Sequence, residues 1–201
     1  EAFNVDSSKI KICPMPRVDF ITDGVAPYER FYSLNPSLSE KKIVLYLPTF
    51  RKRDAYVAQR LKNEFADDDK YALIIKAHPL SNMKIEDKFG YKGNFTTFEL
   101  MKTADVIITD YSASAFEASL LMKPLYFYVP DFDEYVKDRG INVDIRQEMS
   151  KAVYYDSQEL YDAIKNDDYD MNELFEFKNK YIKNTNEKAT VILSSFIVKL
   201  L

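Results

Sequence analysis

Glycine is scarce in this chain of 201 residues, which contains only four. The phosphate-binding loops of dinucleotide oxidoreductases and P-loop NTPases, and the nucleophile elbow of α/β-hydrolases, each need more than one glycine at a fixed spacing. None of the patterns G-x-G-x-x-G, G-x-x-x-x-G-K-[ST] or G-x-S-x-G occurs in the sequence. These three classes of enzyme therefore have no support from a motif.

Cysteine and histidine are each present once, as Cys13 and His78. One cysteine cannot form an internal disulfide, and one of each cannot form a Cys/His metal cluster, so we expect no metal site and a reduced, cytoplasmic setting. A formal net charge of −4 disfavours nucleic acid as a partner. We expect no signal peptide, and no apolar run approaches the ~20 residues of a membrane span. The first residue is Glu1, so we expect a fragment or a processed chain.

Short apolar runs alternate with longer amphipathic stretches along the chain. This alternation is typical of an α/β fold, and it predicts a doubly wound, mostly parallel sheet with helices on both faces. The expected strands are 43–47, 72–75, 106–108 and 125–129. The expected helices are 54–65, a short one capped by Thr97 and running to about 102, 114–122, 157–164 and 186–201.

The first part of the chain is less regular than the rest. We interpret residues 1–40 as a lead-in segment that packs on a single domain, 41–201, which ends in a helix. Residues 9–12 could form a strand ended by Pro14 and Pro16, and 35–37 is a turn signal. The last helix is apolar around most of its circumference, more than one sheet face can bury, so it predicts a second packing partner.

Several polar residues follow the expected strands directly. In doubly wound folds the ligand binds at the carboxyl ends of the strands, near the switch in strand order. Arg51, His78, Asp110 and Ser112 all fall there. We therefore expect a binding site at this edge of the sheet.

The segment from Asp110 to Glu117 leaves a strand and enters a helix. Free N–H groups at a helix start, with the hydroxyls of Ser112 and Ser114, are suited to phosphate. Ser114 and Glu117 also fit the spacing of a capping box, which needs no ligand and is the slightly favoured interpretation on spacing alone. Asp110 shifts the balance towards a site, because an acid at a strand end can orient a ligand hydroxyl.

Three further features allow a functional and a structural interpretation. His78 can bind phosphate or transfer a proton, or can be a structural hydrogen-bonding residue. Arg51 begins a run of three cations at 51–53, which is suited to phosphate but is also typical of a solvated loop. Arg139 precedes Gly140, for which we expect a positive φ, and follows the acidic stretch 131–134, which we expect to form a solvated face.

Taken together, several segments resemble one family, the CDP-glycerol glycerophosphotransferases, which are teichoic-acid primases and polymerases. Each segment is short, but their order and spacing across residues 14–145 make the combination fairly specific. The matching segments are PRVD at 16–19, LYLPTFR at 45–51, KAHP at 76–79, DVIITDYS at 105–112, and KPLYFY at 123–128 running on to RG at 139–140.

The resemblance implies a GT-B architecture of two Rossmann-like halves, of which this chain matches the carboxyl-terminal, donor-binding half. By matching position, His78, Asp110, Ser112 and Glu117 would serve the phosphates and glycerol of a CDP-activated donor, and Arg51 would face the cleft. No separate cofactor is implied. Ala113 stands where the family usually has serine, and Glu117 where it usually has aspartate.

The lipid-linked acceptor and the catalytic base would belong to the other half, at the inner face of the membrane, with peripheral membrane association. The resemblance assigns no catalytic residue to this half, in which His78 is the candidate. Two alternatives are the donor domain of a nucleotide-sugar glycosyltransferase and a non-catalytic nucleotide-binding or interaction domain.

Overall fold

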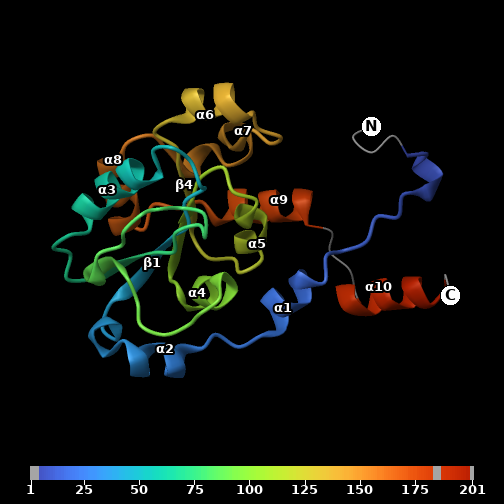
Figure 1. Cartoon of the computed structure of the whole chain (residues 1–201), viewed down its shortest axis with the longest axis horizontal. Helices are drawn as coiled ribbons and strands as arrows, with labels where there is room; N and C mark the ends of the chain where they lie inside the picture. The colour runs from blue at the N-terminus through green and yellow to red at the C-terminus, as the bar shows by residue number, and fades with distance from the viewer. Residues whose placement is uncertain (1–4, 183–186, 200–201) are drawn as a thin grey trace.

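The computed structural model describes residues 5–182 and 187–199. Its centre is a sheet of five parallel strands in the order β2-β1-β3-β4-β5, which confirms the α/β class (Figure 1). The strands are β1 Lys42–Tyr46, β2 Tyr71–Ile75, β3 Val106–Thr109, β4 Leu125–Tyr128 and β5 Val153–Tyr154.

The first four strands are the four apolar runs of the sequence. All but one of their residues are buried, because helices cover both faces of a parallel sheet. β5 was not predicted, since it has only two residues and both are half-buried. It pairs in parallel with the end of β4, where Phe127 lies opposite Val153.

Ten α-helices connect and flank these strands in the described residues. α3 and α8 pack against each other on one face of the sheet, and α5 and α9 pack together on the other (Figure 1). The helices are α1 Arg17–Asp23, α2 Tyr28–Leu34, α3 Asp54–Glu64, α4 Thr97–Thr103, α5 Ser114–Ser119, α6 Phe132–Arg139, α7 Ile145–Glu148, α8 Ser157–Lys165, α9 Met171–Tyr181 and α10 Ala189–Val198.

The strand order changes direction between β1 and β3, although all the strands are parallel. From β1 the chain crosses to β2 on one side, whereas β3, β4 and β5 follow in order on the other side. The connections that leave β1 and β3 therefore run to opposite sides, and the carboxyl ends of these two strands mark the switch point at which doubly wound folds bind ligands.

Two local predictions need correction. No strand forms at residues 9–12: Ser7–Lys9 is a 3-10 helix, and Ile10 is extended but has no neighbouring strand. The cap of α4 is Thr96 instead of Thr97. Glu99 lies three residues after Thr96, and the two form a reciprocal capping box.

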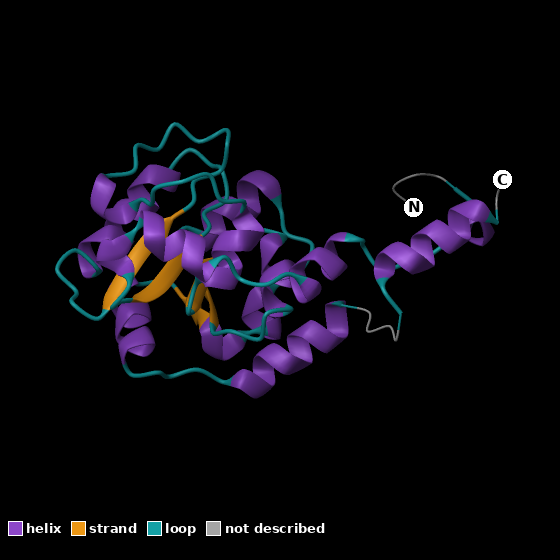
Figure 2. Ribbon diagram, turned by 90° about the horizontal axis from the view of Figure 1, so that it is seen from below, coloured by secondary structure: helices purple, strands orange, loops and turns teal. Residues whose placement is uncertain are grey.

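The last helix, α10, lies apart from the sheet and its covering helices (Figures 1 and 2). The sequence predicted this helix over 186–201, and positions 186, 200 and 201 lie outside the described residues. Only Ala189 of α10 is buried, whereas Val191, Ile197 and Val198 are 42%, 49% and 69% exposed. The described residues therefore cover only part of the apolar surface of α10. Among the described residues, no helix is long and apolar enough to cross a membrane.

Candidate functional site at the carboxyl edge of the sheet

Asp110 lies at the switch point, directly after β3, and its side chain has no exposed surface. The backbone N–H of Thr49, in the loop after β1, donates to both carboxylate oxygens at 3.0 and 2.9 Å, and the Thr49 hydroxyl donates at 2.5 Å. The N–H of Tyr111 donates at 2.7 Å. Burial raises the pKa of Asp110 above its ordinary value, and Arg51 and the Thr49 donors oppose that rise.

Arg51 extends this network to the loop after β4. Its Nη1 lies 2.5 Å from Asp110 Oδ2, and its Nε lies 2.7 Å from Asp131 Oδ2. Only 6% of the side chain is exposed. Burial acts against the positive charge, but Asp110, Tyr46 and Asp131 outweigh it, so the pKa of Arg51 lies above its ordinary value. Arg51 is thus fixed between two carboxylates and does not belong to a solvated loop.

Two aromatic side chains cover the network. The Tyr111 hydroxyl donates to Asp131 at 2.9 Å, and its ring stacks on Tyr135 with centroids 3.7 Å apart. Burial raises the pKa of Tyr111, and the neighbouring Asp131 adds to the rise. The Arg51 guanidinium lies 5.3 Å from the centre of the Tyr111 ring. The loops after β1, β3 and β4 are therefore joined by one hydrogen-bonded cluster.

Sequence reasoning missed Asp131, Tyr111 and Thr49. The expectation that 131–134 forms a solvated face is wrong for Asp131, whose side chain is only 12% exposed. Its position after a strand could have identified Asp131, because it follows β4 at the same edge where Asp110 follows β3. Arg51 bonds the carbonyl oxygen of its near neighbour Thr49, but its second acid, Asp131, is 80 residues away in the sequence.

Ser112 and Ser114 lie where β3 leads into α5. The Ser114 hydroxyl donates to Ser112 Oγ at 2.8 Å, and the Ser114 N–H donates to the same oxygen at 3.2 Å. The capping box expected between Ser114 and Glu117 is wrong, since Ala113 holds the cap position and no side chain caps the helix. α5 has only six residues, so its dipole adds little and the two hydroxyls are the distinctive groups here.

Glu117 does not face Ser114 but binds Arg17 of α1. Arg17 Nη1 lies 2.5 Å from Glu117 Oε1, and the side chains are 54% and 12% exposed. This pair links the lead-in segment to α5, 100 residues later in the chain. Arg17 is a further residue that sequence reasoning did not single out.

His78 lies on the opposite side of β1 from Asp110, after β2. Its side chain is exposed, and its ring lies 6.1 Å from that of Phe50 at an angle of 27°. The backbone N–H of Leu80 donates to His78 Nδ1 at 3.2 Å. In the neutral ring the proton therefore lies on Nε2, which is the nitrogen free for a ligand.

Arg139 ends α6 and lines a small cavity of about 80 Å³ together with Arg51, Lys52 and Tyr135. Gly140 follows with φ of +73°, as the sequence predicted. Of the residues singled out from sequence, the structure joins Arg51 to Asp110 and Ser112 to Ser114 directly. Among the described residues, His78, Glu117 and Arg139 contact neither pair through a hydrogen bond or ion pair.

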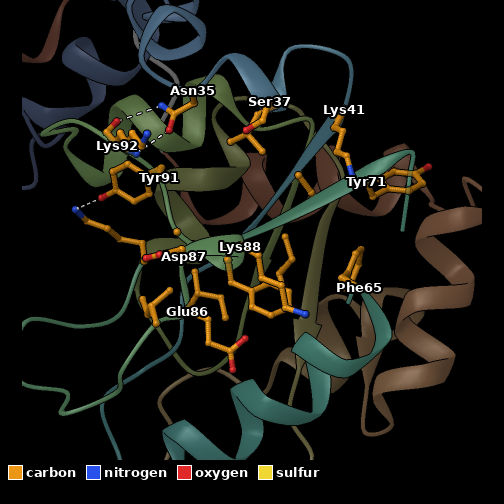
Figure 3. A pocket seen from close by; sticks show the side chains of 18 of the residues that line it. Asn35, Ser37, Lys41, Phe65, Tyr71, Glu86, Asp87, Lys88, Tyr91 and Lys92 are labelled. Atoms are coloured by element: carbon orange, nitrogen blue, oxygen red, sulfur yellow. Dashed lines mark hydrogen bonds between the residues drawn. The ribbon is translucent and has the colours of Figure 1, made fainter. Parts of the chain in front are cut away.

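A larger recess lies elsewhere, along the outer edge of β2 (Figure 3). Its volume is about 1300 Å³. Lys76 Nζ donates to the Tyr91 hydroxyl at 2.8 Å, and Asn35 exchanges hydrogen bonds with the main chain of Lys92. These polar groups bond one another, so they hold the 85–92 loop to α2 and β2. No group of three or more His, Cys, Asp or Glu side chains in the described ranges is arranged to hold a metal ion.

The fold and the carboxyl-edge cluster define a class: a doubly wound domain with polar groups gathered at its topological switch point. A family model places it further. Residues 1–199 match the model described as CDP-Glycerol:Poly(glycerophosphate) glycerophosphotransferase, and the chain belongs to this family. The resemblance seen in the sequence is thereby confirmed.

Curated relatives give the same result. The chain is 29% identical over 209 residues to a teichoic acid poly(ribitol-phosphate) polymerase of Bacillus spizizenii, covering 94% of this chain and 33% of the relative. It is also 29% identical over 177 residues to a teichoic acid glycerol-phosphate primase of Bacillus subtilis, covering 82% of this chain and 45% of the relative. The chain thus spans a third to a half of the length of these relatives.

Among solved structures, the wall teichoic acid polymerase TagF is similar. A TagF variant soaked with CDPG superposes with a TM-score of 0.76 at 25% identity, covering 98% of this chain and 54% of that chain. The likeness extends over essentially the whole chain, so the fold described above is the fold of the matching half of that polymerase.

Proposed function

We propose that this chain is the donor-binding part of a CDP-activated polyol-phosphate transferase of teichoic acid or related cell-wall polymer synthesis. The observation that carries the proposal is the family match over residues 1–199, combined with polar groups gathered at the strand ends. Soaking of the related polymerase with CDPG supports a donor of the same kind.

The carboxyl edge offers the chemistry that a diphosphate needs. His78 presents a free Nε2 at the surface, and Ser112 and Ser114 provide hydroxyls after β3. Arg139 and Lys52, both exposed, contribute positive charge at the rim. We assign donor contacts to these five residues.

Arg51 and Asp110 have a different part in this proposal. Their charged groups are buried and bonded to each other. They fix the loops after β1, β3 and β4 beneath the donor, so the exposed groups are held in place before binding. Preorganised groups of this kind stabilise developing charge without rearranging during the reaction.

The reaction assigned to the complete enzyme is phosphoryl transfer. A hydroxyl of the acceptor attacks the β-phosphorus of the donor, the bond from that phosphorus to the bridging oxygen breaks, and CMP leaves with the bridging oxygen. The acceptor hydroxyl loses its proton to a base. We assign that base, and the binding of a lipid-linked acceptor at the membrane surface, to a part of the enzyme that this chain does not match.

Calorimetry with CDP, CMP, UDP and GDP tests the assignment of the nucleotide. We expect CDP and CMP to bind more tightly than UDP and GDP, and CDP-glycerol and CDP-ribitol can be compared in the same experiment. Equal binding of all four nucleotides, or none, would refute a CDP site while leaving the fold assignment untouched.

An assay of CMP release tests the second part of the proposal. The purified chain, CDP-glycerol and a lipid-linked acceptor are expected to give binding without turnover, because His78 is the only histidine and is assigned to the donor. Turnover by this chain would show that a complete active site is present in it.

A further inference from the structure

α1 contacts three other helices through its polar groups. At its start, Arg17 binds Glu117 of α5 at 2.5 Å. In its middle, Lys102 of α4 donates to the carbonyl oxygen of Phe20 at 2.7 Å. Between these points, Asp19 binds α10. A helix of only seven residues therefore bonds with α4, α5 and α10.

The contact with α10 replaces the cap that this helix lacks. Lys188 holds the cap position of α10 and provides no side-chain cap. Instead, the carboxylate of Asp19 accepts the N–H groups of Ala189 and Thr190, both at 2.8 Å, and the Thr190 hydroxyl at 2.6 Å. Lys188 Nζ adds an ion pair with Asp23 at 2.7 Å. The first turn of α10 is thus fixed by α1 and not by the sheet.

The same short sequence motif, PRVD, supplies both connections. Arg17 and Asp19 are two residues apart, and on a helix such residues point in different directions, so one helix can bind α5 on one side and α10 on another. Because Glu117 is in α5, which begins at Ser114, the position of α10 is linked through α1 to the donor edge.

We propose that Arg17, Asp19 and Glu117 are positioning residues: together they fix the apolar helix α10 at a set place relative to the donor-binding edge. In this assignment Glu117 holds Arg17 instead of contacting the donor. The consequence for catalysis rests on the proposed function, since α10 would then set how the acceptor-binding part of the enzyme approaches the donor. The mechanical link itself does not depend on it.

A distance measurement tests the link directly. Cys13 is the only cysteine and is exposed, so a Cys13→Ser background allows two spin labels, at Ser195→Cys in α10 and Gln59→Cys in α3. Arg17→Met and Glu117→Gln should each broaden the distance distribution, with about a fivefold rise in the displaced population, as expected for losing a part-exposed ion pair. Asp19→Asn should broaden it at least as much.

The double variant and two controls identify the pair. Arg17→Met with Glu117→Gln should be no broader than either single variant, because both remove the same contact. Arg17→Lys, which keeps the charge, should stay close to the unchanged protein. Arg146→Met removes an exposed arginine whose partner, Asp144, is two residues away, and it should leave the distribution unchanged.

Nucleotide binding separates a positioning role from a donor contact. If Glu117 only holds Arg17, then Arg17→Met and Glu117→Gln should change the affinity for CDP by the same small factor. A large loss in Glu117→Gln alone would show that Glu117 contacts the donor. Unchanged distances in both single variants would overturn the link. A protein that binds no nucleotide refutes the proposed function, whereas the distance result still decides the link.

Discussion

Replacing Asp110 by asparagine tests whether the buried network fixes the carboxyl edge. The substitution keeps the shape of the side chain and removes its charge. Asparagine can still accept the Thr49 N–H through one oxygen, but its amide group then faces either the backbone N–H of Tyr111, which donates to Oδ1 at 2.7 Å, or Arg51 Nη1, which donates to Oδ2 at 2.5 Å. A donor would oppose a donor at a position with no exposed surface.

The expected loss in the free energy of unfolding depends on the counter-charge that Arg51 retains in Asp110→Asn. Breaking a buried ion pair from one side costs about 3–5 kcal/mol, because the remaining charge is left buried without its partner. Arg51 retains Asp131, at 2.7 and 3.3 Å, so it keeps one counter-charge. We therefore expect the lower end, about 3 kcal/mol, a large part of the total stability of a domain of this size.

Urea denaturation of Asp110→Asn measures this cost as a change in the free energy of unfolding. Asp133→Asn is the matched control, since Asp133 is an exposed acid of α6 near Asp131, and its change should stay within about 0.5 kcal/mol. A loss below about 1 kcal/mol for Asp110→Asn would mean that the pair contributes little, and the preorganised edge would lose its physical basis.

Three further predictions concern single groups. His78→Ala should leave the free energy of unfolding within about 0.5 kcal/mol, because the side chain is exposed, and should weaken CDP binding about tenfold; unchanged binding in calorimetry would make His78 structural. Lys123→Met should cost about 2–3 kcal/mol in urea denaturation, since Lys123 Nζ donates to the carbonyl oxygens of Lys102 and Ala104 at 2.5 Å each, and an unaltered midpoint would contradict that role. Burial raises the pKa of Tyr126, so its un-ionised form is favoured in the fold, and its contribution to stability is present below pH ~10 and lost as the pH rises above it; in thermal melts the fall in Tm above pH ~10 should be less steep in Tyr126→Phe.

Four strands of the sheet could be predicted from the sequence because they are continuous apolar runs. In a protein of this size, a short run of that kind is most easily buried as a central strand of a sheet. It was insufficient for β5, whose two residues carry no period, and for residues 9–12, where an apolar pattern exists but no neighbouring strand does. Strand formation depends on a partner, which a local pattern does not contain. For the same reason α10 was predicted as a helix, while its attachment through Asp19 was not.

The sequence predicted where the site residues lie in the fold, but it did not predict which residues they bind. The strand-end rule placed Arg51 and Asp110 at one edge, and the structure joins them. That Arg51 is buried between two acids depends on Asp131, which belongs to a different loop. Glu117 shows the same limit: its spacing from Ser114 suggested a cap, but Arg17, distant in sequence, is the group it binds. Spacing describes what a residue can reach within its own helix, and long-range partners compete for the same atoms.

Buried and exposed polar groups have different roles at the carboxyl edge of the sheet. A phosphate ligand needs positive charges and hydroxyl groups that can exchange their bound water for the ligand. Side chains with these groups lie on the rim, where the free-energy cost of losing that water is smallest. A buried arginine with two carboxylates carries no net positive charge, so Arg51 cannot attract a diphosphate from solution while both acids hold it. What it can do is keep three loops at fixed separations, which a flexible lysine would do less well, because a planar guanidinium binds two acids in defined directions at once. Arg51→Lys should therefore weaken donor binding through geometry, although it preserves the charge.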